Sequence, residues 1–416
     1  MKKHLIKERW RKLDNTAKMF SLDDKKNTST FRYSVLLKKD VNPKILQKAV
    51  NKTLDEIPTF KVKKGTGLFW NYIETNKKTI KVEEENEIPC EHINLRKNNN
   101  YLFKVTYYKN KINIDIFHIL TDGLGASVLL KGIIYNYLSI KYKIPNEITE
   151  ENEIANYKDL YLKYCDKTKF TKEKKQYAYQ IPDKPSRRLN NTYHYNISVK
   201  ELKTICKNNN VTITEYITAL YIYSIYKSLY EKKSNKEIVV SVPINLRTMY
   251  NEHTLANFFT YMKVNSNVVG KKKVTFHEVL EYTHNEFKEK LTKDKIESYL
   301  ARDVRIGTNI FIRLAPLFMK KLFIKYFGFS VKRQQTTMLS NVGNVEIDDK
   351  FKIYIDNILV AAMPNRLQQT KCTICSYQDK LNITLNLNIN NQTLPNYFLK
   401  QLKSSVKNIE VISNKE

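Results

Sequence analysis

One stretch of the chain, Ile112 to Ile140, constrains the fold more than any other, because it joins an alternating apolar run to a helical repeat. Alternate positions from Ile112 to His118 share one face, which is the pattern of a half-buried strand. Apolar residues then recur at helical spacing from Leu124 to Tyr137. The stretch therefore predicts a strand, a tight turn and a buried helix, with His118 at the end of the strand.

Glycine is scarce in the chain, with 9 in 416 residues, yet Gly123, Gly125 and Gly132 all lie in this stretch. Gly123 suits a turn that needs positive φ, and Asp122 suits the N-cap of the helix that follows. A histidine has an ordinary pKa of about 6.5 and can accept a proton at neutral pH, as a general base does. A lone histidine at a strand end is more often a packed or solvated residue, but the accompanying aspartate and glycine favour a site at His118.

The motif FHILTDG, with His118, Asp122 and Gly123, resembles the HxxxDG motif of the chloramphenicol acetyltransferase-like superfamily. Two further stretches resemble the second half of bacterial alcohol acetyltransferase-like proteins: Ser241 to Phe259, containing PINLR and TLANFF, and Met338 to Val345, MLSNVGNV. The opening RWRKLDNTAKMF is similar to their N-termini, so the likeness spans nearly the whole chain. Condensation domains usually carry a second histidine before the catalytic one, and this chain has Phe117 there. That difference favours the single-histidine acyltransferases.

The resemblance implies an α/β, or layered α+β, fold of two lobes, each a mixed sheet flanked by helices, with a tunnel between them. It places an N-terminal lobe with the motif at residues 1–180 and a C-terminal lobe at 181–416. It also implies transfer of an acyl group, most simply acetyl, from coenzyme A to a hydroxyl or amine, with His118 as general base. Acyl-CoA would be a co-substrate, with no bound cofactor and no metal.

Other residues of the site follow from the same resemblance. The motif aspartate of the superfamily usually pairs with an arginine, and Arg247 is the candidate partner of Asp122. Asn257, Ser340 and Asn341 are polar residues flanked by apolar ones, and each is a candidate donor to the oxyanion of a tetrahedral intermediate or a contact to substrate. A structural turn is the alternative for all three. Two other functions stay open: a condensation-like enzyme that uses a carrier protein, and a binding protein that retains the fold without turnover.

The net charge of +30 comes from lysines spread along the chain. No helix-turn-helix, zinc finger or RNA-binding signature accompanies it, so a nucleic-acid partner is not expected. The charge would attract the phosphates of coenzyme A or an acidic carrier protein. The N-terminus lacks the apolar core of a signal peptide, and the odd number of cysteines, five, suits a reducing compartment. A cytoplasmic location is therefore expected, and the close pair Cys372 and Cys375 is interpreted as packing rather than a zinc site.

The segment Ile306 to Phe329 is apolar and aromatic, with lysine and arginine interspersed. It is consistent with an amphipathic surface helix that contacts a membrane, where a lipid-like acceptor would also reside. The alternative is an ordinary helix pair that covers the sheet and is broken at Pro316.

The remaining pattern supports a layered fold. Asn42, Thr212 and Thr275 are predicted N-caps of helices, the last two in capping boxes with a glutamate three residues on. Strands are predicted at residues 31–37, 192–197, 351–355, 371–376 and 381–389. The polar region from about 143 to 191 is interpreted as the crossover between the halves.

Overall fold

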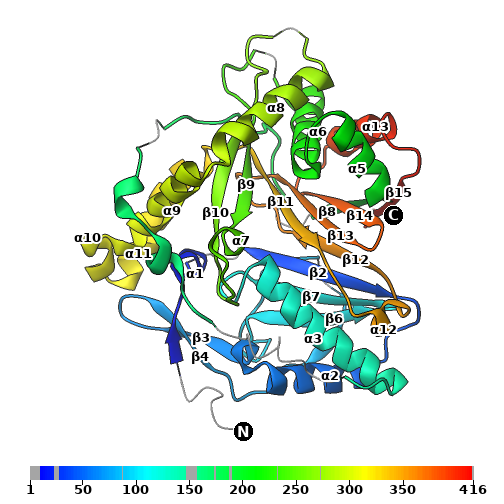
Figure 1. Cartoon of the computed structure of the whole chain (residues 1–416). Coiled ribbons are helices and arrows are strands. Elements are labelled where there is room, and N and C mark those ends of the chain that lie inside the picture. The colour runs from blue at the N-terminus through cyan, green and yellow to red at the C-terminus, as the bar shows by residue number, and fades with distance from the viewer. Residues whose placement is uncertain are drawn as a thin grey trace.

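The computed structural model describes residues 10–22, 28–86, 88–146, 157–172, 175–186, 190–231, 233–271 and 273–414. These residues form two lobes, each built on a mixed sheet flanked by helices, as predicted (Figure 1). The elements of the first half are β1 (Trp10–Lys12), α1 (Asn15–Phe20), β2 (Thr30–Leu37), α2 (Pro43–Glu56), β3 (Val62–Thr66), β4 (Asn71–Thr75), β5 (Val82–Glu84), β6 (Phe103–Tyr108), β7 (Lys111–Phe117), α3 (Gly123–Tyr142) and α4 (Tyr161–Tyr164).

The second half contributes β8 (Asn191–Ser198), α5 (Val199–Asn208), α6 (Ile213–Ser228), β9 (Val239–Asn245), α7 (Arg247–Tyr250), β10 (Phe259–Asn265), α8 (Phe276–Lys290), α9 (Lys293–Thr308), α10 (Ile310–Leu314), α11 (Leu317–Lys332), β11 (Thr337–Asn344), α12 (Asp349–Lys352), β12 (Ile355–Ala362), β13 (Thr370–Tyr377), β14 (Lys380–Leu387), α13 (Thr393–Lys403) and β15 (Glu410–Ser413). The first lobe has a sheet of order β12-β2-β7-β6-β5 and a small sheet β1-β4-β3. The second lobe has a seven-stranded sheet of order β10-β9-β11-β13-β14-β8-β15.

The predicted helix starts are confirmed by their caps. Asn42 accepts from two backbone N–H groups of the first turn of α2, and Thr212 and Thr275 form capping boxes with Glu215 and Glu278. Each cap satisfies backbone donors that would otherwise lack a partner at a helix start.

The strand predicted at residues 351–355 is wrong. Residues Asp349 to Lys352 form the short helix α12, and the strand β12 begins only at Ile355. Phe351 is buried in that helical turn, where its ring stacks on Tyr135 with centroids 4.7 Å apart. The prediction failed because the buried Phe351 lies close in sequence to the apolar residues of β12 and was assigned to that strand.

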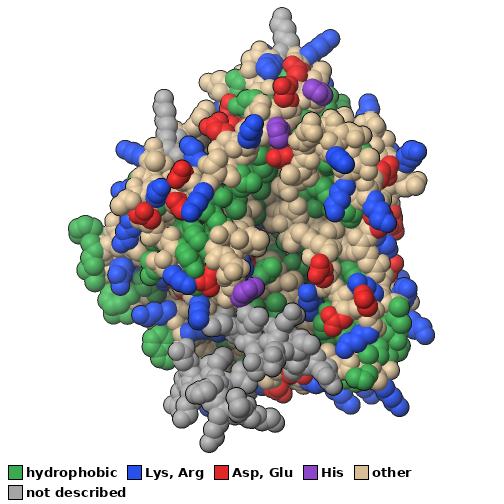
Figure 2. Space-filling view, viewed as in Figure 1, with side chains coloured by type: hydrophobic (Ala, Val, Ile, Leu, Met, Phe, Trp, Pro, Cys, Tyr) green, Lys and Arg blue, Asp and Glu red, His purple; other side chains and the backbone are tan. Residues whose placement is uncertain are grey.

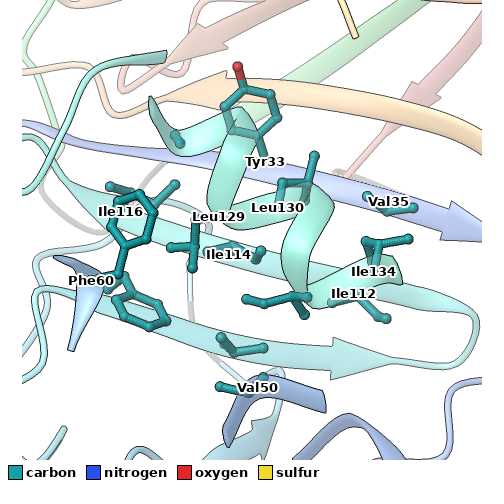
Figure 3. Packing of buried hydrophobic residues seen from close by; sticks show 14 of the residues in the cluster. Tyr33, Val35, Val50, Phe60, Ile112, Ile114, Ile116, Leu129, Leu130 and Ile134 are labelled. Atoms are coloured by element: carbon teal, nitrogen blue, oxygen red, sulfur yellow. The ribbon is translucent and has the colours of Figure 1, made fainter. Parts of the chain in front are cut away.

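Strand β7 is buried on both faces, whereas a half-buried strand was predicted. Its isoleucines face helix α3, where Leu129, Leu130 and Ile134 pack against them (Figure 3). The alternate face carries Asn113 and Asp115, and Asp115 is also buried because both of its oxygens accept hydrogen bonds from the Arg32 guanidinium at 2.6 and 2.7 Å. A strand face of polar residues that packs against the rest of the protein gives the same alternation of apolar and polar residues in the sequence as a face exposed to water.

Strand β12 ties the two halves together. It comes from the second half of the chain but pairs antiparallel with β2 at the edge of the first sheet, and it also contacts β13 and β14 of the second sheet. The division into residues 1–180 and 181–416 stays a prediction, and this topology shows that the first sheet needs a strand from beyond residue 180.

Helix α3 is the one helix among the described residues that is long and apolar enough to cross a membrane by length and composition. Half of that apolar window is buried inside the protein, and the helix packs on α2 and β2. The arrangement is that of a core helix, which passes the same test.

Candidate active site

The His118 side chain follows directly after β7 and lies in a box of aromatic rings. The ring centroids of Phe20, Phe31 and Phe259 are 4.5, 4.9 and 5.5 Å from that of the imidazole. Phe20 and Phe31 belong to the first lobe, and Phe259 begins β10 of the second. The ring therefore lies where the two lobes meet. The histidine is half-buried, so part of it stays accessible to solvent.

The side-chain amide of Asn257 fixes the tautomer of His118. Its Oδ1 lies 3.0 Å from His118 Nδ1, while its Nδ2 donates to the Asp14 carboxylate at 2.9 Å and to the His118 backbone carbonyl at 3.1 Å. Turning the amide over would place its oxygen against two acceptors, so this orientation is the one that satisfies the network. Since Oδ1 only accepts, His118 Nδ1 carries the proton and Nε2 keeps its lone pair.

The surroundings of His118 keep the ring neutral. Burial lowers the pKa of His118 below its ordinary value, because the imidazolium would lose hydration. The charge of Asp122 and the hydrogen bond to Asn257 raise that pKa, and the positive charge of Lys371 lowers it. The net direction is downward, so the lone pair on Nε2 is available at neutral pH.

Asp14 completes this network from the N-terminal segment. It caps α1 by accepting from the Ala17 N–H at 2.7 Å, and its second oxygen accepts from Tyr157 at 2.8 Å and from both nitrogens of Asn257. Burial raises the pKa of Asp14 to about 6, although these hydrogen bonds oppose the shift. Asp14 lies in the N-terminal stretch that carried the resemblance, but no pattern in the sequence marked it as a site residue.

The predicted contact between Asp122 and Arg247 is present. The two carboxylate oxygens accept from the Arg247 guanidinium at 2.8 and 3.0 Å, and both side chains are buried. Arg247 also donates to the carbonyls of Thr254 and Ala256, at 3.0 and 2.6 Å, while Asp122 accepts from the Phe258 N–H at 3.0 Å. The pair therefore clamps the loop that carries Asn257 onto the loop that carries His118.

The glycine prediction needs a correction. Gly123 does not have positive φ; among the described glycines only Gly270 and Gly343 do. The glycine required by space is Gly125, where a Cβ would lie 1.9 Å from Thr121 Oγ1 and 3.0 Å from the Leu255 carbonyl oxygen. The turn is held instead by the Asp122 cap, which accepts from Gly125 N at 3.3 Å, so ordinary backbone angles suffice.

The candidate oxyanion donors separate in the structure. Asn257 is at the histidine, but both of its amide hydrogens already donate, so the predicted oxyanion role does not fit it. Asn341 is exposed, donates to Thr214 Oγ1 at 2.9 Å and accepts from the Gly343 N–H. Ser340 is half-buried on β11, two residues before Val342, whose side chain lies against Gly123. Asn341 is closer to Val342 along the strand, but its amide already bonds to Thr214 and Gly343, so Ser340 is the candidate that remains.

Sequence reasoning missed Lys371. It lies at the start of β13, is 8% exposed, and is close enough for its charge to act on His118. No local pattern marks Lys371, because its position near His118 depends on how β13 assembles with the neighbouring strands. The neighbouring Cys372 and Cys375 point into different cores, one in each lobe, which agrees with packing.

Two cavities are lined by described residues, and His118 lines neither of them. One, of about 210 Å³, is lined by residues of β9, β10, α8 and α9, and the other lies along β8 and β15. The predicted tunnel past His118 stays a prediction.

Comparison with known proteins agrees with this fold. The structure is similar to the trichothecene 15-O-acetyltransferase TRI3 from Fusarium sporotrichioides, with 9% identity, TM-score 0.61 and coverage of 95% of this chain and 96% of that one. It is similar to TRI101 of F. sporotrichioides complexed with coenzyme A and T-2, with 10% identity, TM-score 0.61 and coverage of 95% and 98%. A variant of the starter condensation domain of rhizomide synthetase, in complex with C8-CoA, shows 11% identity, TM-score 0.62 and coverage of 95% and 94%.

The fold is thus that of the chloramphenicol acetyltransferase-like acyltransferases. No curated protein sequence matches the chain. The alcohol acetyltransferase family model matches residues 133–406, about two thirds of the chain. The chain belongs to the alcohol acetyltransferase family, and its HxxxDG motif lies just before the matched region.

Proposed function

We propose that the protein transfers an acyl group, most simply acetyl, from coenzyme A to the hydroxyl of a small or lipid-like alcohol, with His118 as the general base. The observation that carries this proposal is the tautomer of His118: Nδ1–H is held by Asn257, and Nε2 is left with its lone pair. The half-buried ring, lodged among aromatic side chains, favours the neutral form that the reaction needs.

The reaction balances around that nitrogen. His118 Nε2 takes the proton of the acceptor hydroxyl while the hydroxyl oxygen attacks the thioester carbonyl carbon. This attack forms a tetrahedral oxyanion. As the oxyanion collapses, the carbon–sulfur bond breaks and the imidazolium returns the proton to the departing thiolate. The products are an ester and free coenzyme A, and an amine acceptor would give an amide by the same steps.

Two further residues have supporting parts in this proposal. The Ser340 hydroxyl is the donor that we assign to the oxyanion, because its strand passes the start of α3. Asp122 and Arg247 position the two loops and do not contact substrate. Asn257 orients the imidazole.

The choice of coenzyme A as donor is supported by the family and by two similar structures, one of which holds coenzyme A and the other C8-CoA. A carrier protein as donor is the second candidate, and the similarity to a starter condensation domain favours it. The basic surplus of the chain suits either partner.

The test is an assay of thiol release with acetyl-CoA and longer acyl-CoAs, against a panel of alcohols and amines, with mass spectrometry of the products. His118→Ala should lower the rate by roughly 10² to 10⁴-fold without lowering the melting temperature. His277→Ala, at an exposed histidine of α8, is the matched control and should behave as the wild type. Ester formation that persists in His118→Ala would exclude this base, and transfer from an acylated carrier protein alone would favour the second candidate.

A further inference from the structure

An exposed apolar surface covers α10 and α11. Seven of the 21 exposed large hydrophobic side chains among the described residues fall within residues 310–323, so they are strongly clustered. They are between 48% and 81% exposed: Ile310, Phe311, Leu314, Phe318, Met319, Leu322 and Phe323. Figure 2 shows these hydrophobic side chains gathered at the left edge of the molecule, over α10 and α11.

Helix α11 turns apolar side chains toward solvent and buries a lysine, the opposite of an ordinary surface helix. Phe318 and Leu322, one turn apart, face outward, whereas Lys320 is only 3% exposed. The Lys320 ammonium donates to the carbonyls of Phe69 and Arg313, at 2.8 and 3.1 Å, and lies 4.0 Å from the centre of the Trp70 ring. A helix that buries Lys320 and exposes Phe318 and Leu322 is suited to an apolar medium on its outer side.

A second segment, distant in the sequence, extends this surface. The turn between β3 and β4 carries Leu68 and Phe69, 72% and 42% exposed, and the Leu68 carbonyl accepts from the Leu317 N–H at 2.8 Å. Figure 1 shows this hairpin reaching out beneath α10 and α11. The surface, which we call the 310–323 patch, therefore consists of residues 310–323 together with Leu68 and Phe69, fastened to one another through Lys320 and Leu317.

The two segments that form the 310–323 patch carry only positively charged residues, although Lys63 at the edge of the patch pairs with Glu74 of β4. Residues 310–323 and 62–70 contain five lysines and arginines and no aspartate or glutamate. Arg313 and Lys321 are exposed beside the apolar side chains. Burial lowers the pKa of Lys64, and the charge of Lys321 lowers it further, so the two lysines repel each other across the gap between hairpin and helix. An anion at this position would relieve that repulsion.

We propose that the 310–323 patch inserts into the surface of a membrane that contains anionic lipids. Its aromatic and aliphatic side chains would enter the region between headgroups and acyl chains, and Arg313, Lys321 and Lys64 would meet the phosphates. Apolar and cationic groups side by side, on a convex surface made of a helix pair and a loop tip, match that interface. This inference does not depend on the acyl-transfer chemistry.

The experiment is flotation of the full chain with vesicles of phosphatidylcholine, alone or mixed with phosphatidylglycerol. The variant Phe311→Ser/Phe318→Ser/Leu322→Ser should reduce binding to the mixed vesicles roughly tenfold or more. The matched control Leu162→Ser/Leu291→Ser/Ile353→Ser removes three apolar side chains elsewhere that are also exposed, by 48% to 62%, and should bind as the wild type does. Both variants should keep the wild-type melting temperature, because the changed side chains are exposed.

The contribution of the positive charges to membrane binding is tested by a second pair of variants. Arg313→Gln/Lys321→Gln should weaken binding only to vesicles with phosphatidylglycerol, while Lys203→Gln/Lys207→Gln on α5 should not. The proposal is overturned if the wild type does not float with either vesicle, or if the patch variant floats as well as its control. Sedimentation velocity separates the competing explanation: wild-type dimers that dissociate in the patch variant, without vesicle binding, would show that the 310–323 patch joins two copies of the chain.

Discussion

Asp14 accepts hydrogen bonds from both nitrogen atoms of Asn257, from the backbone N–H at 3.2 Å and from the side chain at 2.9 Å. The Oδ1 atom of the same Asn257 side chain accepts a hydrogen bond from His118 Nδ1–H. A carboxylate near the N-terminus thus decides which tautomer the histidine adopts, through one amide. The chain of contacts runs across both lobes, from α1 through the loop before β10 to the end of β7.

Replacing Asp14 by asparagine tests that relationship. The asparagine at position 14 keeps the network only if its side-chain oxygen faces the Asn257 NH₂. If its own NH₂ faces Asn257 instead, the Asn257 amide must turn over, and its NH₂ would then favour the other tautomer of His118. We expect Asp14→Asn to lower kcat roughly 10²-fold with KM little changed, since substrate contacts stay in place. Steady-state kinetics at pH 8 measure this.

Tyr157→Phe is the matched control for that variant. It removes another donor to the same carboxylate oxygen, at 2.8 Å, without touching Asn257. We expect its kcat at pH 8 to stay within a few-fold of wild type, because Asp14 is ionised there. Equal losses in the two variants would mean that Asp14 acts through general stability rather than through the orientation of the amide.

Parts of both lobes were predictable because their signals are local. The strand, turn and helix around His118 rest on periodicity and on one cap, and the N-caps Asn42 and Thr212 rest on residues adjacent to their helices. The contact between Asp122 and Arg247 was expected from the resemblance, and it spans 125 residues.

Other parts of the site and fold could not be predicted, because they depend on how distant segments of the chain assemble. Asn257 was singled out as polar, but its role follows from Asp14, 243 residues away, and no pattern in the sequence connects the two. Lys371 and β12 are similar cases, since each is placed by strands from elsewhere in the chain. The positive φ expected of Gly123 failed for a different reason: a local cap can hold a turn with ordinary backbone angles.

Arg247 provides a prediction about the clamp between the loops. Arg247→Ala would leave the buried Asp122 carboxylate without its charge partner, so we expect the free energy of unfolding to fall by about 3–5 kcal/mol. Arg247→Lys keeps the charge but cannot hold two carboxylate oxygens and two carbonyls, so we expect a smaller loss of stability and a clear fall in kcat. Urea unfolding and kinetics measure the two effects.

Arg302→Lys is the control for the clamp. Arg302 is half-buried, pairs with the neighbouring Asp303 at 3.1 Å and donates to the Tyr261 carbonyl at 3.0 Å, and an ion pair that water reaches in this way contributes about 0–1 kcal/mol. We expect its unfolding curve to match the wild type closely. If Arg247→Lys also matched the wild type in both stability and kcat, the clamp would not be what positions Asn257.

Gly125 and Gly123 make a second matched pair. A Cβ at Gly125 would collide with Thr121 Oγ1, which itself donates to the Leu255 carbonyl at 2.7 Å, so we expect Gly125→Ala to destabilise the protein by about 1–3 kcal/mol and to lower kcat. A Cβ at Gly123 would meet Val342 Cγ1 at 3.2 Å, a side chain that can shift, so Gly123→Ala should cost less. Thr121→Ala combined with Gly125→Ala should recover part of the loss, and no recovery would place the strain at the Leu255 carbonyl instead.

The acidic limb of the pH profile distinguishes the two titrating groups of the network. Activity needs His118 neutral, and burial lowers its pKa below the ordinary value, so its protonation begins only in more acidic solution. It also needs Asp14 ionised, and burial raises the pKa of Asp14 to about 6. We therefore expect kcat/KM to be level above pH 7 and to fall as the pH drops through about 6. Because the Tyr157 hydroxyl lowers the pKa of Asp14, Tyr157→Phe should move this limb to higher pH if Asp14 sets it. An unmoved limb would assign it to His118 alone.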